Sequence, residues 1–388
     1  MANEDRVLVT HVGSLARPKK LLDYIAAIGN DVAVDAAAFE ACLKDSVADV
    51  VARQAQAGVD IVSDGEFGKF RTWSAYIVSR LGGLEERDIS VATGAGKDRR
   101  KFPEFYSQYF HTQNLPARGT LTCVAPLTYT GGAAIKRDIG NLKAALGQTR
   151  VVAGFLPVVA PASAVPNFKN EYYKSDEEFF FALADALREE YATIVDSGLF
   201  LQVDDAFLPY MYDVAFADQP LENYKKWAAL RIEALNHALR GLPVERIRYH
   251  ICWGSFNTPH VTDVPLKDIV DLVLEVKAGA YCIEMGNPRH EHEWRVWEKT
   301  KLPPGKKLIP GVISHSTNVV EHPELVAERL TRIARLVGRE NVMGGTDCGF
   351  AQTPYVRRVH PSIMWAKLEA LAAGARLASR ELWSRMAA

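Results

Sequence analysis

One pattern that recurs along the sequence limits the folds that this chain can adopt. An amphipathic helical stretch ends near a glycine, a short apolar stretch follows, and polar or acidic residues come directly after it. One copy begins at Ser175, which forms a capping-box pattern with Glu178, and reaches Gly198 before the strand-like residues 199–205. Alternation of helices with short apolar strands is typical of α/β folds with a parallel sheet.

The pattern predicts eight strands, which is the number in a closed (β/α)₈ barrel, or TIM barrel. The strands are expected within residues 7–11, 59–66, 151–160, 199–205, 247–252, 281–284, 308–313 and 341–348. Eight strands favour such a barrel over an open sheet, so we expect residues 1–388 to form a single barrel domain. Residues 68–150 are too many for one crossover, and we interpret them as an insertion between strands 2 and 3 that covers the barrel mouth.

The composition excludes several classes of partner. The 46 Lys and Arg residues balance the 47 Asp and Glu residues, so the net charge of −1 gives no electrostatic basis for binding nucleic acid or an anionic membrane. Five cysteines argue against a disulfide framework and favour a reducing compartment. The first residues show no secretory signal, and the longest apolar stretch, residues 151–165, is too short to cross a bilayer. We therefore expect a cytoplasmic protein.

Four potential metal ligands lie where predicted strands give way to glycine-containing loops. They are His250, Cys252, Glu284 and Cys348. Residues two apart on a strand point to the same side, so His250 and Cys252 can face one centre. One imidazole, two thiols and a carboxylate form a complete tetrahedral set for Zn²⁺. The alternative is that the cysteines are small buried apolar residues and the histidine is a core residue with its hydrogen bonds satisfied.

The sixth predicted strand offers two candidate ligands, Cys282 and Glu284. Both point into the barrel because they are two residues apart, and spacing alone does not choose between them. Two positions correspond to about 6.6 Å along a strand. We expect Cys282 in the packed interior and Glu284 nearer the mouth, where a substrate thiol could displace it from zinc.

Such a ligand set suits one kind of chemistry. Two thiolates and one carboxylate give zinc a formal charge of −1 before substrate binds, and an electron-rich metal leaves an incoming thiolate nucleophilic. Hydrolytic zinc enzymes use a more cationic metal that acidifies water. The residues therefore favour alkyl transfer to a thiol.

Motifs along the chain resemble the catalytic barrel of cobalamin-independent methionine synthase. They are Thr10-His-Val-Gly13-Ser14, Asp64-Gly-Glu66, Gln202-Val-Asp204, His250-x-Cys252, Ile283-Glu284, His315-Ser316 and Asp347-Cys348-Gly349. The resemblance implies the zinc ligands His250, Cys252, Glu284 and Cys348. It also implies Ser14 for the homocysteine carboxylate, Glu66 and Asp204 for its amine, and His315 as a catalytic proton relay.

The resemblance leaves the alkyl donor open. The folate-stacking segment of that family has no counterpart, because residues 102–110 contain aromatic side chains in another order. Single-barrel relatives include epoxyalkane:coenzyme M transferase, and Arg17, Lys69 and Arg71 could bind its sulfonate. Methylfolate, a corrinoid protein and an epoxide are thus all candidate donors. Homocysteine is the expected acceptor, because two acidic residues suit an ammonium group better than a sulfonate.

Other interpretations remain open at this stage. Uroporphyrinogen decarboxylases share the barrel without needing zinc, and a non-catalytic, zinc-stabilised barrel is also conceivable. Asp64 or Glu66 could cap a helix, and His315 could be a solvated loop residue. Residues 289–292 could grip an anion or form a solvated face. The sequence also leaves the oligomeric state open, a homo-oligomer included.

Overall fold

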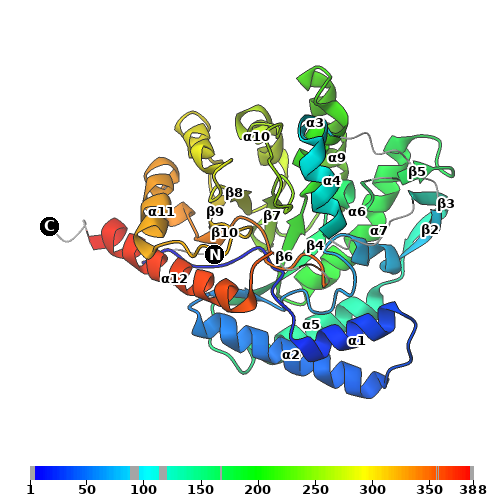
Figure 1. Ribbon diagram of the computed structural model, residues 1–388, viewed down its shortest axis with the longest axis horizontal. Helices are drawn as coiled ribbons and strands as arrows, with labels where there is room; N and C mark the ends of the chain where they lie inside the picture. Colours follow the sequence, from blue (N-terminus) through cyan, green and yellow to red (C-terminus); the bar gives the residue numbers. More distant parts are fainter. Residues whose placement is uncertain are drawn as a thin grey trace.

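The structure is a computed structural model that describes residues 5–87, 96–112, 120–166, 168–354, 356 and 358–384. Its centre is a curled parallel sheet of seven strands (Figure 1). In spatial order the strands are β1 (Ile61–Ser63), β4 (Ala153–Val159), β6 (Phe200–Asp204), β7 (Ile247–Ile251), β8 (Ala280–Glu284), β9 (Lys307–Ile313) and β10 (Gly345–Thr346). All six adjacent pairs are parallel, so the predicted α/β class is confirmed.

The first predicted strand, residues 7–11, differs from the expectation. It is not a regular strand, but Thr10 N donates to Gly344 O at 2.9 Å and Ile61 N donates to Val9 O at 3.1 Å. These bonds connect it to both edges of the sheet, in the position of an eighth strand. Val9 N bonds to the Asp60 carboxylate at 2.8 Å, so a side chain replaces part of the backbone ladder.

Helices predicted between the strands are present. The longer ones are α1 (Lys19–Gly29), α2 (Ala36–Gln56), α5 (Gly132–Leu146), α7 (Asp176–Asp196), α9 (Leu221–Ala238), α10 (Leu266–Glu275), α11 (Pro323–Val337) and α12 (Pro361–Ser384). As expected, the Ser175 hydroxyl accepts from Glu178 N at 3.1 Å and caps α7. Among the described residues, no helix has the length and apolar character required to cross a membrane.

Short helical segments connect these elements. They are η1 (Ala75–Arg80), α3 (Lys97–Lys101), α4 (Pro103–Thr112), α6 (Pro161–Ala164), α8 (Phe207–Met211), η2 (Tyr212–Phe216), η3 (Val244–Arg246), η4 (Glu291–Glu298) and η5 (Arg339–Asn341).

The region predicted as an insertion, residues 68–150, contributes a second sheet. Strands β2 (Leu81–Arg87) and β3 (Thr120–Tyr129) are antiparallel, and β5 (Phe168–Asn170) pairs with β3. Helix α5 at the end of this region contacts α2 and β4, as a helix packed outside a barrel would. The insertion over the mouth stays a prediction, and residues 88–95 and 113–119 lie outside the described part.

A layer of apolar side chains fills the interior of the sheet. Its members come from residues 7–11 and from most of the strands or their approaches: Leu8, Ile61, Phe155, Phe200, Ala280, Cys282, Ile309 and Met343. A larger cluster occupies the space between the strands and the outer helices. Cys282, which is 2% exposed, belongs to the interior layer, so the deeper place expected for it agrees with the structure.

Candidate active site

A cavity of about 350 Å³ opens at the carboxyl ends of the strands. Six residues that the sequence singles out line it: Ser14, Glu66, Asp204, His250, Cys252 and Cys348. They come from five separate places in the chain, and parallel strands bring them to one edge of the sheet. Catalytic side chains gather at this edge in barrel enzymes. The cavity is therefore the candidate active site.

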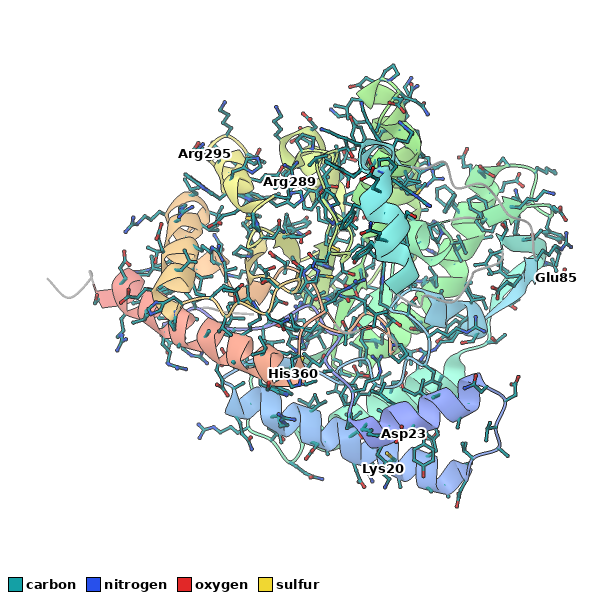
Figure 2. All side chains as sticks on the ribbon, in the orientation of Figure 1. Lys20, Asp23, Glu85, Arg289, Arg295 and His360 are labelled. Carbon is teal, nitrogen blue, oxygen red and sulfur yellow. The ribbon has the colours of Figure 1, made fainter. Side chains whose placement is uncertain are left out.

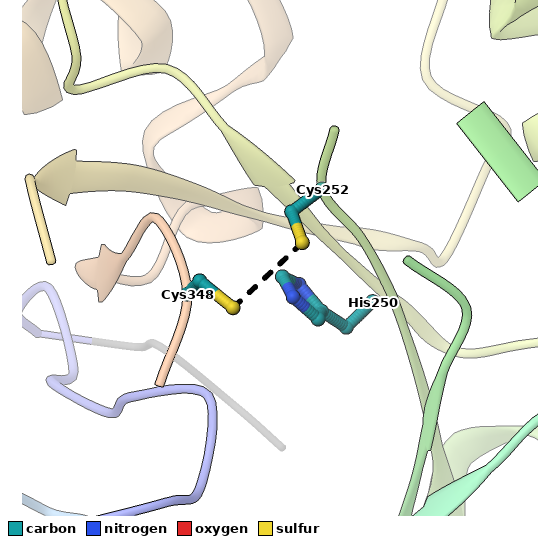
Figure 3. A group of neighbouring side chains, drawn as sticks. All are labelled: His250, Cys252 and Cys348. Carbon is teal, nitrogen blue, oxygen red and sulfur yellow. Dashed lines mark hydrogen bonds between the residues drawn. The ribbon is translucent and has the colours of Figure 1, made fainter. Parts of the chain in front are cut away.

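Three potential metal ligands converge at the cavity (Figure 3). His250 is at the end of β7, Cys252 follows that strand, and Cys348 follows β10. Their ligand atoms all lie within 4.8 Å of one another, and the two sulfur atoms are 3.7 Å apart. All three residues are buried. The predicted convergence of imidazole and thiols is thus present.

The orientation of His250 supports a metal site. Its Nδ1 lies 3.3 Å from the backbone oxygen of Cys282, and its Nε2 is buried without a hydrogen-bond partner among the described residues. Metal-binding histidines commonly use one ring nitrogen for such a carbonyl and the other for the metal. A core histidine with satisfied hydrogen bonds, the alternative considered from the sequence, would not leave Nε2 unpaired. The donor set therefore fits zinc.

The two thiols are electrostatically linked. Cys252 donates to the Cys348 sulfur, and this bond lowers the pKa of Cys348 well below its ordinary value while raising that of Cys252. Cys348 is thus prepared to be a thiolate even though burial alone would raise its pKa. The arrangement suits a softer metal that prefers thiolate ligands.

Glu284 lies beside this group. Its carboxylate accepts from Trp253 N at 3.2 Å and from Asn287 Nδ2 at 2.8 Å. It lies within 4.8 Å of His315 and Asp347, which form a second group of possible ligands. Its role as the fourth zinc ligand stays a prediction.

His315 is buried, so its interpretation as a solvated loop residue is wrong. Neither ring nitrogen has a hydrogen-bond partner among the described residues. Asp347, to which the sequence assigned no role, accepts from Met285 N at 2.9 Å and Gly286 N at 2.6 Å. It ties the end of β10 to the end of β8. The one sequence feature that could have indicated a role for Asp347 is its position directly before Cys348.

Glu66 has an unusual backbone conformation. Its φ is +62°, a left-handed value that a non-glycine residue adopts at a cost of roughly 1–3 kcal/mol. Asp64 accepts from Glu66 N at 2.9 Å, so Asp64 supports the turn. The Glu66 carboxylate lies 3.3 Å from Lys69 Nζ. Strain held at a pocket wall is typical of a functional position.

The basic residues considered for a sulfonate are engaged elsewhere. Arg17 donates to the backbone oxygens of Glu66, Lys69 and Ala351, and it is not among the described residues that line the cavity. Arg71 lies 4.0 Å from Glu86 in an exposed pair. These contacts show structural roles and give no support to the expected substrate-binding role of Arg17.

The carboxylates of Asp204, the last residue of β6, and of Asp205, which follows it, point in different directions. Asp204 faces the cavity and accepts from Gln202 at 2.9 Å, whereas Asp205 accepts from Ser163 at 2.6 Å and Tyr249 at 2.9 Å. Burial raises the pKa of Asp204 to about 7.

Ser14 lies where the loop after residues 7–11 meets the loop after β10. Its hydroxyl accepts from Ala351 N at 3.3 Å. A Cβ on Gly349 would come within 2.0 Å of that hydroxyl, so glycine is needed there. Ser14 is thus held at the cavity close to Cys348.

Sequence reasoning missed the aromatic wall of the cavity. Trp73 and Phe207 stack with centroids 5.8 Å apart, and Tyr210 and Phe256 continue the wall. They come from loops and short helical segments, where side chains do not follow the regular hydrophobic spacing of a long helix or a strand. Arg289 is exposed on the outside of the molecule (Figure 2).

His290 is buried and has two acidic partners. It stacks on Trp253 with a centroid distance of 4.0 Å and contacts Asp263 at 3.0 Å and Glu293 at 2.9 Å. The interpretation of residues 289–292 as a solvated face is therefore wrong for His290, which forms part of an internal ion-pair network.

The fold and the site define an α/β protein with a curled parallel sheet and a thiol-containing ligand group at its carboxyl edge. No family model matches the chain. The chain is 23% identical over 345 residues to a methionine synthase of Thermococcus kodakarensis, covering 89% of this chain and 85% of that protein. It is 25% identical over 368 residues to a 2-hydroxypropyl-CoM lyase of Xanthobacter autotrophicus, covering 88% and 86%.

A solved structure shows the same fold. A B12-independent methionine synthase from a Shewanella species, in complex with selenomethionine, superimposes with a TM-score of 0.72 at 20% identity, covering 98% of this chain and 99% of that one. The resemblance to cobalamin-independent methionine synthases, and to the CoM lyase related to them, thus extends over most of the chain.

Proposed function

We propose that the protein is a zinc-dependent S-alkyltransferase that methylates the thiol of homocysteine. The observation that carries the proposal is the group formed by His250, Cys252 and Cys348 at the cavity, where the Nε2 atom of His250 is buried without a hydrogen-bond partner among the described residues. The similarity to methionine synthases supports the same chemistry. A zinc-stabilised barrel without activity is less consistent with ligands that line a cavity.

His250, Cys252 and Cys348 would hold the metal, and Glu284, one strand away, would complete the set. Bound zinc would keep the acceptor thiol in its nucleophilic thiolate form at neutral pH. Because these three residues lie at or directly after the ends of β7 and β10, they would fix the position of that sulfur.

The other polar residues of the cavity would orient the amino acid. Glu66 and Asp204 provide carboxylates for its ammonium group, and the Ser14 hydroxyl would bind its carboxylate. Charge-assisted hydrogen bonds of this kind are about twice as strong as neutral ones. His315, whose ring nitrogens have no hydrogen-bond partner in the described part of the chain, would relay the proton released from the thiol.

A second candidate is the opening of an epoxide by coenzyme M, which the similarity to the CoM lyase favours. The acidic lining of the cavity argues against it, because Glu66 and Asp204 would repel a sulfonate. The methyl donor is a small molecule or a corrinoid protein in this proposal.

We also propose that residues 7–11 close the sheet into an eight-stranded barrel, with residues 68–150 over its mouth.

Thiol consumption tests the proposal. The zinc-loaded protein is offered homocysteine or 2-mercaptoethanesulfonate with methylfolate, methylcobalamin or epoxypropane, and the products are identified by mass spectrometry. Methionine formation supports the proposal, whereas consumption of 2-mercaptoethanesulfonate alone supports the epoxide reaction. The absence of metal after purification without chelator, with no uptake of added zinc, would overturn both.

A further inference from the structure

A second cavity, of about 200 Å³, lies beside the first. Its walls are formed by residues of α6, α7, α8 and α9, by residues 165 and 166, and by the first residue of β5; α6, α7 and α9 contact one another (Figure 1). The walls are apolar, with Phe168, Phe180, Met211 and Trp227 prominent, except for one charged side chain, Arg231. No acidic residue is among the described residues that line it.

Arg231 is buried with few partners. It is 8% exposed, and its one hydrogen bond among the described residues goes from Nη1 to Trp227 O at 3.0 Å. Its Nε is buried without a hydrogen-bond partner among the described residues. Asp176 and Asp205 attract the guanidinium electrostatically, but no described carboxylate forms an ion pair with it. Burial of a guanidinium without a directly bonded anion is costly, so such a group is typically explained by function.

Two aromatic rings hold the guanidinium in place. Its central carbon lies 4.3 Å from the ring centroid of Phe180 and 4.0 Å from that of Trp227. Such cation–π contacts offset part of the desolvation and fix the plane of the group. Burial lowers the pKa of Arg231 to about 10, so the side chain remains charged at neutral pH. The cavity therefore presents a fixed positive charge among apolar walls.

We propose that this second cavity binds a carboxylate carried on a small apolar body, with Arg231 as its anion partner. A guanidinium fork matches the geometry of a carboxylate, and the apolar walls suit a hydrocarbon or aromatic body. One water needs about 10–15 Å³ of such a cavity, so the second cavity admits on the order of ten waters or a ligand of similar size.

The second cavity adjoins the candidate active site. Pro166 and Met211 line both cavities. A carboxylate bound at Arg231 is therefore either a separate small acid or, where the inference rests on the proposed function, the acidic end of the alkyl donor. The chemistry at Arg231 is the same in both cases.

Binding of benzoate and of benzyl alcohol to the zinc-loaded protein, measured by calorimetry, tests the inference. The two ligands share an aromatic ring and differ in charge. We expect benzoate to bind at least tenfold more tightly, and Arg231→Gln to remove this preference. Arg246→Gln is the matched control, because Arg246 also lies over an aromatic ring and donates to a backbone carbonyl but does not line the cavity.

Equal affinities for the two ligands, or full benzoate binding by a folded Arg231→Gln protein, would overturn the inference. The comparison of charged and neutral ligands uses the unaltered protein, so it decides the question even if the variant does not fold. Binding requires no turnover, and a failure of the proposed alkyl transfer would leave this result intact. Competition of benzoate with the alkyl donor would identify the carboxylate as part of the donor, and non-competitive inhibition as a separate acid.

Discussion

Strand β7 carries two buried basic side chains one layer apart, and their surroundings differ. Arg248, in the inner layer, donates to Thr10 Oγ1 at 3.0 Å and to the backbone oxygen of His11 at 2.9 Å, and stacks on Phe155. His250, nearer the mouth, has a buried Nε2 atom with no hydrogen-bond partner in the segments that the structure describes. Arg248 Nε also lacks a hydrogen-bond partner among the described residues, but the other two guanidinium nitrogens hold residues 7–11 to the sheet. His250, in contrast, lines the cavity, where a ligand can reach it.

Strand β8 repeats the comparison. Cys282 lies in the inner layer among apolar side chains, 3.8 Å from the Arg248 guanidinium, whereas Glu284 lies beside the metal-ligand group. On both strands, the role that we infer for a side chain inside the sheet therefore depends on its distance from the mouth. We expect changes in the outer layer to affect metal and activity, and changes in the inner layer to affect stability.

The largest expected effect is that of removing a ligand. Cys252→Ala should eliminate stoichiometric zinc and lower the rate of thiol alkylation at least about 10³-fold, or ~4 kcal/mol, because the acceptor thiolate is then no longer stabilised. Metal analysis and initial rates provide the measurement. Cys42→Ala, at a buried cysteine of α2, is the control and should keep both. A zinc-replete, active Cys252→Ala protein would break the comparison.

Glu284→Ala is the next test of the outer layer. The variant loses a carboxylate that adjoins the ligand group, and we expect zinc affinity to fall about 10–100-fold. Competition with a chromogenic chelator measures the affinity. Glu284→Gln, which retains the size of the side chain, should have a similar effect if the negative charge is what matters. An unchanged affinity in both variants would assign Glu284 to the group with His315 and Asp347 alone.

Arg248→Met should affect stability rather than metal. It removes the two hydrogen bonds to residues 7–11 and leaves their oxygens buried, so we expect the free energy of unfolding to fall by about 2–4 kcal/mol. Denaturant unfolding of the metal-free protein measures this. Arg246→Met is the control, with an expected change below about 0.5 kcal/mol because Arg246 is only partly buried. Loss of zinc from a folded Arg248→Met protein would contradict the division by depth.

A pH effect of intermediate size should come from the ion-pair network behind Trp253. Burial alone would lower the pKa of His260 and His290, but hydrogen bonds to Asp263 and, for His290, to Glu293 outweigh it and raise the values to about 9 and about 10. Unfolded histidines lose their protons near pH 6.5. The stabilisation is therefore complete below about pH 6.5 and is lost as the pH rises through 9 to 10.

Thermal unfolding between pH 6.5 and 10 checks this expectation. The slope is at most about 1.4 kcal/mol per pH unit for each proton. Asp263→Asn removes the shared carboxylate and should reduce the slope in this window. A slope identical to that of the unaltered protein would show that other groups cause the pH dependence.

Much of the fold followed from the sequence because strands and helices leave periodic patterns. Seven of the eight strands and the capped start of α7 were predictable in this way. The irregular pairing of residues 7–11, for which a strand was expected, was not predictable, because the side chain of Asp60 and single bridges replace the regular ladder there. No local sequence pattern predicts the hydrogen bond from Val9 N to Asp60, a residue about 50 positions away.

The site divides in the same manner. The convergence of His250, Cys252 and Cys348 could be predicted, since parallel strands bring their carboxyl ends together. The engagement of Arg17 with backbone oxygens and the burial of His315 could not, because loop conformation decides them. The charge of Arg231 was visible in the sequence, but its lack of an ion pair among the described residues depends on which helices surround it.

The smallest expected effect belongs to Cys282, and it gives the sharpest test of the division by depth. Cys282→Ala removes one sulfur from the inner layer, where Arg248 and Gln202 lie 3.8 Å away. The small cavity left behind should cost about 1–2 kcal/mol of unfolding free energy. Zinc content and kcat should change less than about twofold, because the histidine ligand is oriented by the Cys282 backbone oxygen, which the substitution retains. Parallel metal analysis of Cys282→Ala and Glu284→Ala provides the measurement. If Cys282→Ala empties the site while Glu284→Ala retains its metal, the third sulfur is a ligand, and depth in the sheet does not separate structural from functional residues in this protein.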